Sequence, residues 1–197
     1  KGAEVAVLKT RAEITKPATA MVTGDAYGTK VSVDKLVVSG PTAYQATCQG
    51  TEGKTVRNAI GALSVPNVGK IDRAFTTKNG YMNLDKSAMN FTSHIAGGKL
   101  GPLSFGAVES SASASKTKDG NVELSSSSSI ASLRVGGKVY NVPTQPNTVV
   151  EIPGVAKLTF NQVLRQQRYI SVNALVVEVP GLNTKVVVGH SAAGVVS

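Results

Sequence analysis

The 197-residue chain is long enough for one β domain of ordinary size or two small ones, with a core that needs no disulfide. It has no Trp, four Phe and five Tyr, so Val, Ala, Leu and Ile must form most of that core. The net charge of +9 would attract polyanions, although the 21 Lys and Arg residues are dispersed. No apolar run is long enough to span a membrane, and a single cysteine excludes an intramolecular disulfide.

The first part of the chain contains short segments that predict strands. Glu4–Lys9 alternates apolar and polar residues, and Lys30–Val38 does so more clearly. Thr42–Cys48 continues in the same style. Gly50–Gly69 is less regular, and we expect a loop there with one short helical turn around Val56–Leu63.

Three dipeptides predict tight β-hairpin turns: Asn79-Gly80, Asp119-Gly120 and Gly136-Gly137. Such turns need a positive φ, which Asn, Asp and Gly adopt at little cost, and their twist matches that of paired strands. We therefore expect antiparallel pairing between the segments on either side of each dipeptide.

Two serine-rich stretches, residues 110–115 and 125–129, flank Asp119-Gly120 at similar distances. Such composition is also typical of a flexible linker. A hairpin at Asp119-Gly120 would instead place the two stretches opposite each other, and we predict this sheet of small residues. One face of it would carry Ala112, Ala114, Ile130 and Leu133.

The last third of the chain, residues 133–195, consists of β-branched runs that end at Gly, Pro or Asn. Only Phe160–Ile170 is helix-like, because Leu164 and Arg168 are four residues apart and Gln and Arg favour helices. Flanking strands could absorb this short window. We find no convincing internal repeat in the sequence.

These features predict a single all-β domain over residues 1–197. Its expected architecture is an antiparallel β-sandwich or a twisted two-layer sheet with hairpin connections. A β-solenoid is the alternative, which the many small residues favour. The three tight turns and the lack of a repeat argue against it.

The segment Gly189–Gly194 (GHSAAG) has the form of a nucleophile elbow around Ser191. In hydrolases a helix follows this turn, and the acid and His of the triad lie downstream. Only three residues follow Gly194, so His94 would have to serve from upstream in an unusual order. A strand end is the better interpretation, and we expect no enzymatic activity.

We predict no metal site and no cofactor. The two histidines, His94 and His190, have no Cys or His at ligand spacing. Asp119, Asn121 and Glu123 alternate as in a calcium loop, but hairpin chemistry explains the first two. The acids are not clustered as glycosidases require, exposed aromatic platforms are scarce, and nucleotide-binding motifs are absent.

Two patterns match covalent modifications without being specific. Lys157 and Asn173, with Glu178 close in sequence, have the residue types of the Lys–Asn isopeptide crosslinks found in some Gram-positive surface proteins. Asn90–Thr92 fits an N-glycosylation sequon, which matters only in a eukaryotic secretory route. We favour neither.

Several segments carry a resemblance to a known family: Ala46–Cys48, Ala131–Gly137, Pro146–Thr148, Ile152–Gly154, Leu158–Gln162, Ser171–Leu175 and Val186–Gly194. Through them the chain resembles the choice-of-anchor P family, which are secreted proteins of actinobacteria. The resemblance implies secretion and attachment to the cell envelope through a variable C-terminal anchor. It brings no catalytic residues. Members of the family often have a second Cys in the central Ser/Ala strands. This chain has none, so Cys48 is expected to be an unpaired thiol.

We therefore expect a non-enzymatic domain outside the cell or on its surface, with a structural or adhesive role that includes self-association at strand edges. The alternative is an extracellular module that binds a polyanion or a small ligand, with Arg134, Arg165 and Arg168 as candidate contacts. The expected partner is a cell-envelope polymer or another surface protein, not nucleic acid. Cys48 would either stay free or pair between chains.

Overall fold

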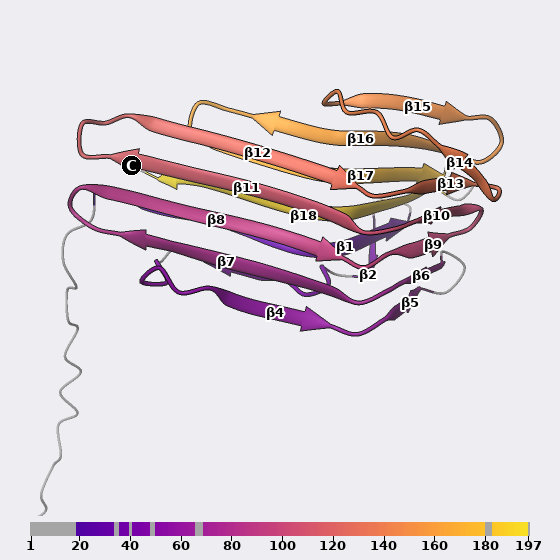
Figure 1. The fold of residues 1–197 in the computed structure, drawn as a ribbon, viewed down its shortest axis with the longest axis horizontal. Coiled ribbons are helices and arrows are strands. Elements are labelled where there is room, and N and C mark those ends of the chain that lie inside the picture. The colour runs from indigo at the N-terminus through magenta and orange to yellow at the C-terminus, as the bar shows by residue number, and fades with distance from the viewer. Residues whose placement is uncertain are drawn as a thin grey trace, which may run out of the picture.

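The computed structural model of the protein describes residues 19–33, 36–39, 41–47, 50–65, 69–179 and 183–196. Every element within these ranges is a β-strand, and the strands pair in antiparallel fashion. Figure 1 shows these strands stacked in two layers. The predicted two-layer antiparallel architecture is therefore confirmed, and the solenoid alternative is wrong. The predicted strand Glu4–Lys9 and Cys48 lie outside the described residues.

The layer at the rear in Figure 1 is a seven-stranded sheet in the order β15-β16-β17-β18-β1-β2. The seventh strand, β3, pairs with the first half of β1, whereas β2 pairs with its end. The C-terminal strand pairs with β1 along its whole length, from Met21↔Val196 to Val33↔Thr184. The strands of this layer are β1 (Met21–Val33), β2 (Leu36–Ser39), β3 (Gln45–Thr47), β15 (Thr148–Ile152), β16 (Ala156–Arg165), β17 (Tyr169–Val179) and β18 (Thr184–Val196).

The front layer contains two sheets placed end to end. The five-stranded sheet has the order β12-β11-β8-β7-β4, and the six-stranded sheet has the order β14-β13-β10-β9-β6-β5. The strands are β4 (Val56–Ile60), β5 (Leu63–Val65), β6 (Gly69–Ile71), β7 (Ala74–Met82), β8 (Lys86–Ile95), β9 (Gly98–Leu100), β10 (Leu103–Phe105), β11 (Val108–Thr117), β12 (Val122–Ile130), β13 (Leu133–Val135) and β14 (Lys138–Tyr140).

The two sheets of the front layer are one bent sheet, because the strand register continues from one to the other. Ala74 pairs with Ile95 in the five-stranded sheet, and Ile71 pairs with Gly98 in the six-stranded sheet, so no residue is gained or lost between them. The same continuity holds between β10–β13 and β11–β12. Each long strand is therefore interrupted without a change of partner.

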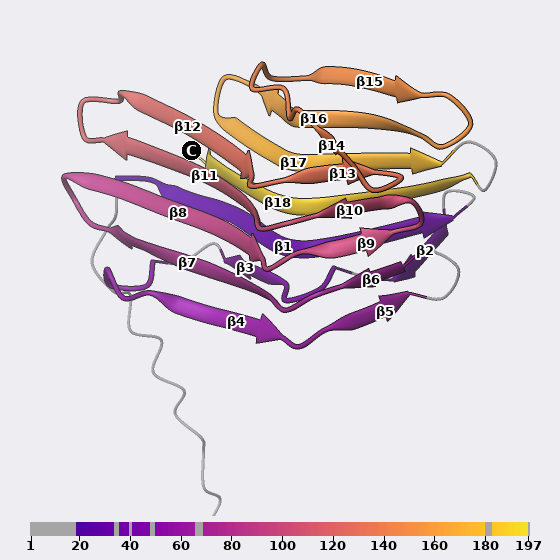
Figure 2. The ribbon, with the colours of Figure 1, turned by 45° about the vertical axis from the view of Figure 1, so that its right-hand side comes forward.

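The interruptions form a transverse crease at residues 61–62, 72–73, 96–97, 106–107 and 131–132. Backbone hydrogen bonds continue through it. The Asp72 N–H donates to the Gly97 carbonyl (2.9 Å), and the Ala131 N–H donates to the Ala107 carbonyl (2.8 Å). Figure 2 shows the resulting corner in each long strand. Positions 61–62, 96–97 and 131–132 are equally spaced, so the structure contains a repeat of paired strands that the sequence does not display.

The rear layer has its own crease, opposite that of the front layer. Asn161 in β16 and Gly189 in β18 have positive φ values of 46° and 69°, which interrupt the alternation of side chains between the two faces. A Cβ on Gly189 would lie 3.1 Å from the Val108 side chain, and one on Gly28 would lie 2.9 Å from the Cβ of Ala74. Ala74 and Val108 directly follow the front crease, so the two creases are in contact.

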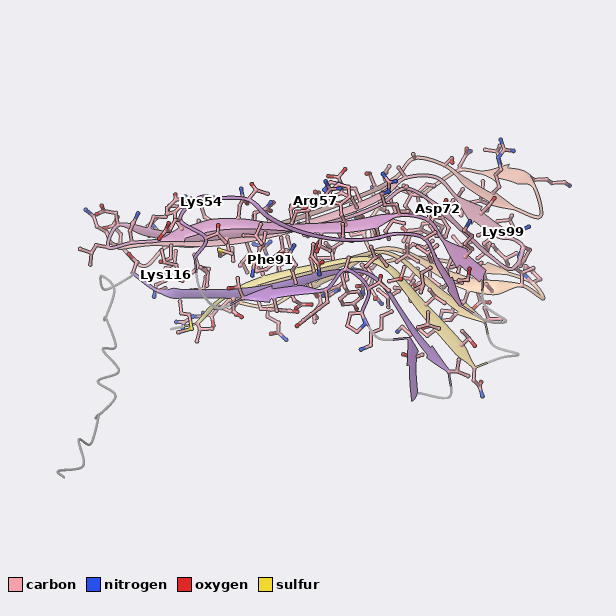
Figure 3. The ribbon with its side chains drawn as sticks, turned by 90° about the horizontal axis from the view of Figure 1, so that it is seen from below. Lys54, Arg57, Asp72, Phe91, Lys99 and Lys116 are labelled. Carbon is pink, nitrogen blue, oxygen red and sulfur yellow. The ribbon has the colours of Figure 1, made fainter. Side chains whose placement is uncertain are left out.

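The five-stranded half of the sandwich has a core of small side chains. Phe91 is fully buried between the layers, where a Cβ on Gly24 would lie 2.5 Å from its ring (Figure 3). The Ser110 and Ser191 hydroxyls hydrogen-bond across the layers (2.9 Å), and Ser191 also donates to the Ser110 carbonyl (3.1 Å). The buried cluster in this half comprises Ala20, Val22, Ala26, Met89, Phe91, Ala112, Ala114, Ile170, Ala193 and Val195.

The six-stranded half has larger core residues, and Figure 3 shows the two layers diverging there. Phe105 from the front layer and Phe160 from the rear layer belong to this cluster. Aliphatic side chains fill the space between the layers, among them Ile71, Leu100, Leu103, Leu133, Leu158, Leu175, Val177, Val186 and Val188. The change from small to large core residues at the creases matches the change in layer separation.

Two of the three predicted hairpins are confirmed. Asp119-Gly120 connects β11 to β12, with Gly120 at a φ of 88°. Gly136-Gly137 connects β13 to β14, with φ values of 55° and 83°, as a type I′ turn requires. The predicted sheet of serine-rich strands is also confirmed, because Ser110 pairs with Ser128 and the register continues between them and the turn.

The predicted turn at Asn79-Gly80 is wrong, because both residues lie inside β7. A Cβ on Gly80 would collide with the Ala88 carbonyl and the Met89 sulfur, so the glycine serves close packing rather than a positive φ. The chain turns at residues 83–85 instead. There the Asn83 side-chain carbonyl accepts hydrogen bonds from the N–H groups of Asp85 (3.0 Å) and Lys86 (2.8 Å).

Three predicted elements differ from the structure. Lys30–Val38 is not one strand, because β1 ends at Val33 and β2 returns antiparallel to it. The expected helical turn at Val56–Leu63 is replaced by β4 and the start of β5. The helix-like window Phe160–Ile170 belongs to β16 and β17, where pairing with the flanking strands outweighs the helix preference of Gln and Arg.

A Cβ on Gly24 would collide with the Ala192 carbonyl of β18 and with the Phe91 ring of the facing layer. We therefore predict that Gly24→Ala lowers the free energy of unfolding by about 2 kcal/mol or more, because the new methyl group overpacks this position. Gly61→Ala is the control, because no atom lies within 4 Å of its Cβ position. It should leave stability within about 0.5 kcal/mol of the parent protein. Urea denaturation measures both, and equal effects would contradict the close packing.

Candidate functional site

The six-stranded sheet turns one residue of each short strand toward solvent. In β10, for example, Leu103 and Phe105 are buried, and Ser104 between them points outward. The same alternation exposes Lys70 between two inward positions of β6. The central residues of the six strands are Ser64, Lys70, Lys99, Ser104, Arg134 and Val139.

Strand register places three cations of this set in one line across the sheet. Lys70 lies directly opposite Lys99, Ser104 pairs with Lys99, and Arg134 pairs with Ser104. With neighbouring strands about 5 Å apart, the Lys99 and Arg134 backbones are about 10 Å apart. We call Lys70, Lys99 and Arg134 the cationic row.

No carboxylate neutralises the cationic row within the described part of the chain. Lys54, Lys118 and Lys185 each have a carboxylate oxygen within 3.7 Å, whereas no ion pair within 4.0 Å involves a member of the row. Like charges directly opposite each other on a sheet are destabilising. The row therefore carries repulsion that a bound anion would relieve.

Two neighbouring groups shape the ends of the row. The Arg134 guanidinium donates to the Gly137 carbonyl (3.1 Å), which holds the side chain over the β13–β14 turn and leaves its other N–H groups available. Asp72 lies on the crease two residues beyond Lys70, without forming an ion pair with the row. Figure 3 shows Asp72 and Lys99 in the half where the layers diverge.

The three predicted arginines do not gather in one place. Arg134 belongs to the cationic row. Arg165 and Arg168 lie at the β16–β17 turn, where Arg165 donates to the Leu124 carbonyl of β12 (3.0 Å). Leu124 and Arg134 are ten positions apart along β12 and β13, which places the two groups roughly 30 Å apart.

Sequence reasoning missed Lys70 and Lys99. A signal was present, because Gly69–Ile71 and Gly98–Leu100 are both Gly-Lys-aliphatic triplets. Both triplets became strands whose central lysine faces outward. Their pairing with each other depends on the meander of the front layer, which the sequence alone did not provide.

The GHSAAG segment lies in β18, and the side chains of its Ser191 and His190 are hydrogen-bonded to residues of other strands. Ser191 points into the core, whereas His190 points to the outer face of the rear layer. The His190 Nδ1–H donates to the Asn173 side-chain oxygen (2.6 Å), and its Nε2 lies 3.4 Å from an Asp25 carboxylate oxygen. The imidazole stacks on Tyr27 with 4.4 Å between ring centroids.

His94 lies on the opposite face of the sandwich, on β8. Its ring stacks on Phe75 (4.4 Å between centroids), and its Nδ1 is 3.7 Å from the Glu109 carboxylate. The Arg57 guanidinium also lies over the Phe75 ring, 4.0 Å from its centroid. The two histidines are thus not brought together, and no group of three or more His, Cys, Asp or Glu residues is close enough to hold a metal in the described residues.

The structure separates the residues of the isopeptide pattern. Lys157 lies opposite Glu178 at the far end of β16, with 4.0 Å between the charged atoms. Asn173 lies opposite Gln162 instead and donates to its side-chain oxygen (2.8 Å). A Lys157–Asn173 crosslink does not fit this register.

No family model matches the sequence, and no curated protein matches it significantly. Among solved structures, Ail, the attachment invasion locus protein of Yersinia pestis in complex with the heparin analogue sucrose octasulfate, is 11% identical. The match covers 89% of this chain and 95% of that one at a TM-score of 0.23, which is too low to support any inference. Within the described ranges, no helix is long and apolar enough to cross a membrane.

The environment of Tyr27 predicts a loss of stability in alkali. Burial, then the charge of Asp25, then Tyr169 raise the Tyr27 pKa from 10.0 to about 12. Between these values the unfolded chain releases a proton that the folded chain retains, so stability falls as pH rises through this window. Tyr27→Phe should reduce the drop in the urea midpoint between about pH 8 and pH 11.

Tyr81→Phe is the control for this measurement, because the Tyr81 ring is 41% exposed at the other face of the molecule. An identical alkaline drop in the parent protein, Tyr27→Phe and Tyr81→Phe would contradict the assigned environment of Tyr27.

Proposed function

We propose that this domain is a non-enzymatic extracellular module that attaches to an anionic polymer of the cell envelope through the cationic row. The observation that carries the proposal is the alignment of Lys70, Lys99 and Arg134 with no neutralising carboxylate. Secretion and envelope attachment rest on the resemblance of the C-terminal segments. Binding through the row would hold the rigid sandwich against the polymer, and this is the structural or adhesive role that we propose.

The row has the geometry that a linear polyanion needs. It runs across the strands, so a chain of phosphate or sulfate groups laid along it meets two adjacent lysines and then an arginine. Lysine supplies flexible point charges, and arginine supplies a planar fork that binds two anion oxygens at once. The net charge of +9 adds long-range attraction that brings the polymer to the surface.

The polar side chains of the GHSAAG segment are hydrogen-bonded to other protein groups, which supports a binding role over a catalytic one. Ser191 is fully buried and bonded to Ser110, and His190 is fixed by Asn173. In a working triad, the serine would face the histidine and a substrate. Here adjacent residues point to opposite faces of β18.

Neutralising the row should weaken polyanion binding. The variant Lys70→Ser/Lys99→Ser/Arg134→Ser is expected to bind inorganic polyphosphate about tenfold or more weakly than the parent protein at moderate salt. Its slope of log K against log salt should fall by about 2, because roughly three counterion-releasing contacts are lost. Titration calorimetry at several salt concentrations measures both quantities.

The matched control is Lys54→Ser/Lys118→Ser/Lys185→Ser, which removes the same charge from positions that already have carboxylate partners. Equal losses in both triple variants would show that only net charge matters, and the row would not be a site. Binding that does not depend on salt would contradict the charge mechanism altogether and favour association through strand edges.

A further inference from the structure

We propose that a groove on the outer face of the five-stranded sheet binds a neutral saccharide. The groove lies near the β7–β8 and β11–β12 turns, on the other side of the crease from the cationic row. Its volume of about 660 Å³ falls within the range of small-molecule sites. This site does not depend on the proposed attachment to a polyanion.

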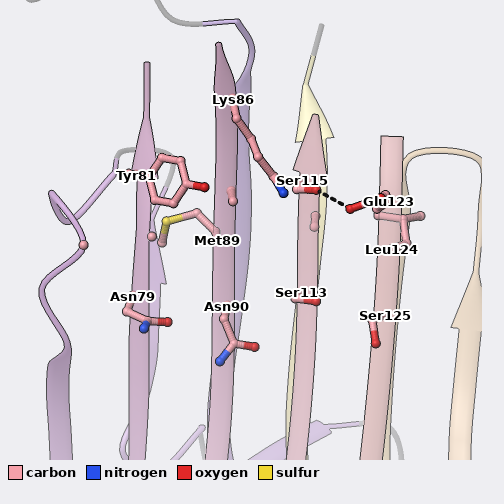
Figure 4. Close-up of a pocket in the computed structure, with 14 residues that line it drawn as sticks. Asn79, Tyr81, Lys86, Met89, Asn90, Ser113, Ser115, Glu123, Leu124 and Ser125 are labelled. Atoms are coloured by element: carbon pink, nitrogen blue, oxygen red, sulfur yellow. Dashed lines mark hydrogen bonds between the residues drawn. The ribbon is translucent and has the colours of Figure 1, made fainter. Parts of the chain in front are cut away.

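Two adjacent cross-strand rows form the floor and ends of the groove, and Figure 4 shows them on four neighbouring strands. The register of β7, β8, β11 and β12 aligns each row. The first row is Asn79, Asn90, Ser113 and Ser125, and the second is Tyr81, Ala88, Ser115 and Glu123.

A loop fixes the side of the groove next to β7. The N–H groups of Thr51 (2.9 Å) and Gly53 (3.0 Å) both donate to the Gly80 carbonyl, so the loop takes the place of β4 beside this end of β7. Tyr81 extends from β7 next to this loop with 41% of its surface exposed. Ala88 on β8 and Ser115 on β11 are small and leave space between Tyr81 and β12, and the Lys86 side chain extends from the start of β8 toward Ser115 (Figure 4).

The floor carries polar groups that the protein leaves available. The side chains of Asn79, Ser113 and Ser125 have no hydrogen-bond partner among the described residues. The Asn90 side-chain oxygen accepts from Ser111 (3.0 Å), so its NH₂ group remains to donate to a ligand. Ser115 donates to Glu123 (3.2 Å), which holds the carboxylate at the β12 side of the groove.

This combination favours a neutral saccharide over the other ligand classes. Amides and hydroxyls both donate and accept, as sugar hydroxyls do. An apolar ligand would leave those amides without partners at a cost in free energy. Lys86 and Glu123 both line the groove, so it carries no net charge that would select an ion. The Tyr81 ring supplies an apolar face against which the C–H groups of a sugar ring can pack.

The sheet also makes the site rigid before binding. Asn79, Asn90 and Ser113 extend from three hydrogen-bonded strands, so their spacing is fixed by the ladder. A saccharide laid across the strands meets a new side chain at each strand. Little conformational entropy is lost by the protein, which favours binding even with few contacts.

Binding is tested with the whole chain and a panel of neutral oligosaccharides of glucose, mannose, galactose, arabinose and N-acetylglucosamine, followed by NMR. At least one of these probes should shift the side-chain NH₂ signals of Asn79 and Asn90 without shifting the Lys70 and Lys99 amides. Tyr81→Ala should weaken that binding about fivefold or more. Tyr44→Ala is the matched control, because Tyr44 is similarly exposed (48%) outside the groove, and it should leave affinity unchanged.

Asn79→Ala is a second variant, which removes an outward side chain without touching the core, and it should also weaken binding. The interaction should persist at high salt, which separates it from polyanion binding. No shift with any member of the panel overturns the proposal. Equal affinity in the parent protein and Tyr81→Ala also overturns it, whatever the polyphosphate experiment shows.

Discussion

Two layers in close contact can bend only if they bend along the same line. The front layer bends where five strands are interrupted side by side, and the rear layer bends at Asn161 and Gly189. Gly28 and Gly189 have no Cβ, so Ala74 and Val108 of the front layer approach the rear backbone there. Larger residues at these glycines would separate the layers, and the paired creases would lose their contact.

The shared bend divides the surface as well as the core. In the five-stranded half, small inward residues keep the layers close, and the outward positions form rows of Ser, Thr and Asn. In the six-stranded half, large inward residues fill a wider core, and the short strands expose Lys70, Lys99 and Arg134. The groove and the cationic row therefore occupy different planes of one continuous sheet, so the two ligands that we propose would not compete for the same surface.

Local chemistry in the sequence was enough for the class of fold and for turns made by positive φ. In Asp119-Gly120 and Gly136-Gly137 the glycines have positive φ values, and the turn conformation alone accounts for them. The prediction of a turn at Asn79-Gly80 was wrong because Gly80 is required for a different reason. Ala88 and Met89 of the neighbouring strand lie too close for a Cβ at this position, and no local sequence pattern reveals that contact. Helix propensity in Phe160–Ile170 lost to pairing with β17 and β18 for the same reason: tertiary context overrides weak preferences.

The candidate sites were harder to predict, because each depends on long-range register. Arg134 could be chosen from its sequence as an exposed cation, but its partners, Lys70 and Lys99, are brought to it by strands far away in the chain. A slip of one residue in β6 or β9 would turn a lysine into the core and an aliphatic side chain out to solvent. The cost of burying an unpaired ammonium is far larger than the repulsion between two exposed lysines. Burial of Ile71 and Leu100 therefore fixes the register, and the alignment of the cations follows from it even though the cations repel each other.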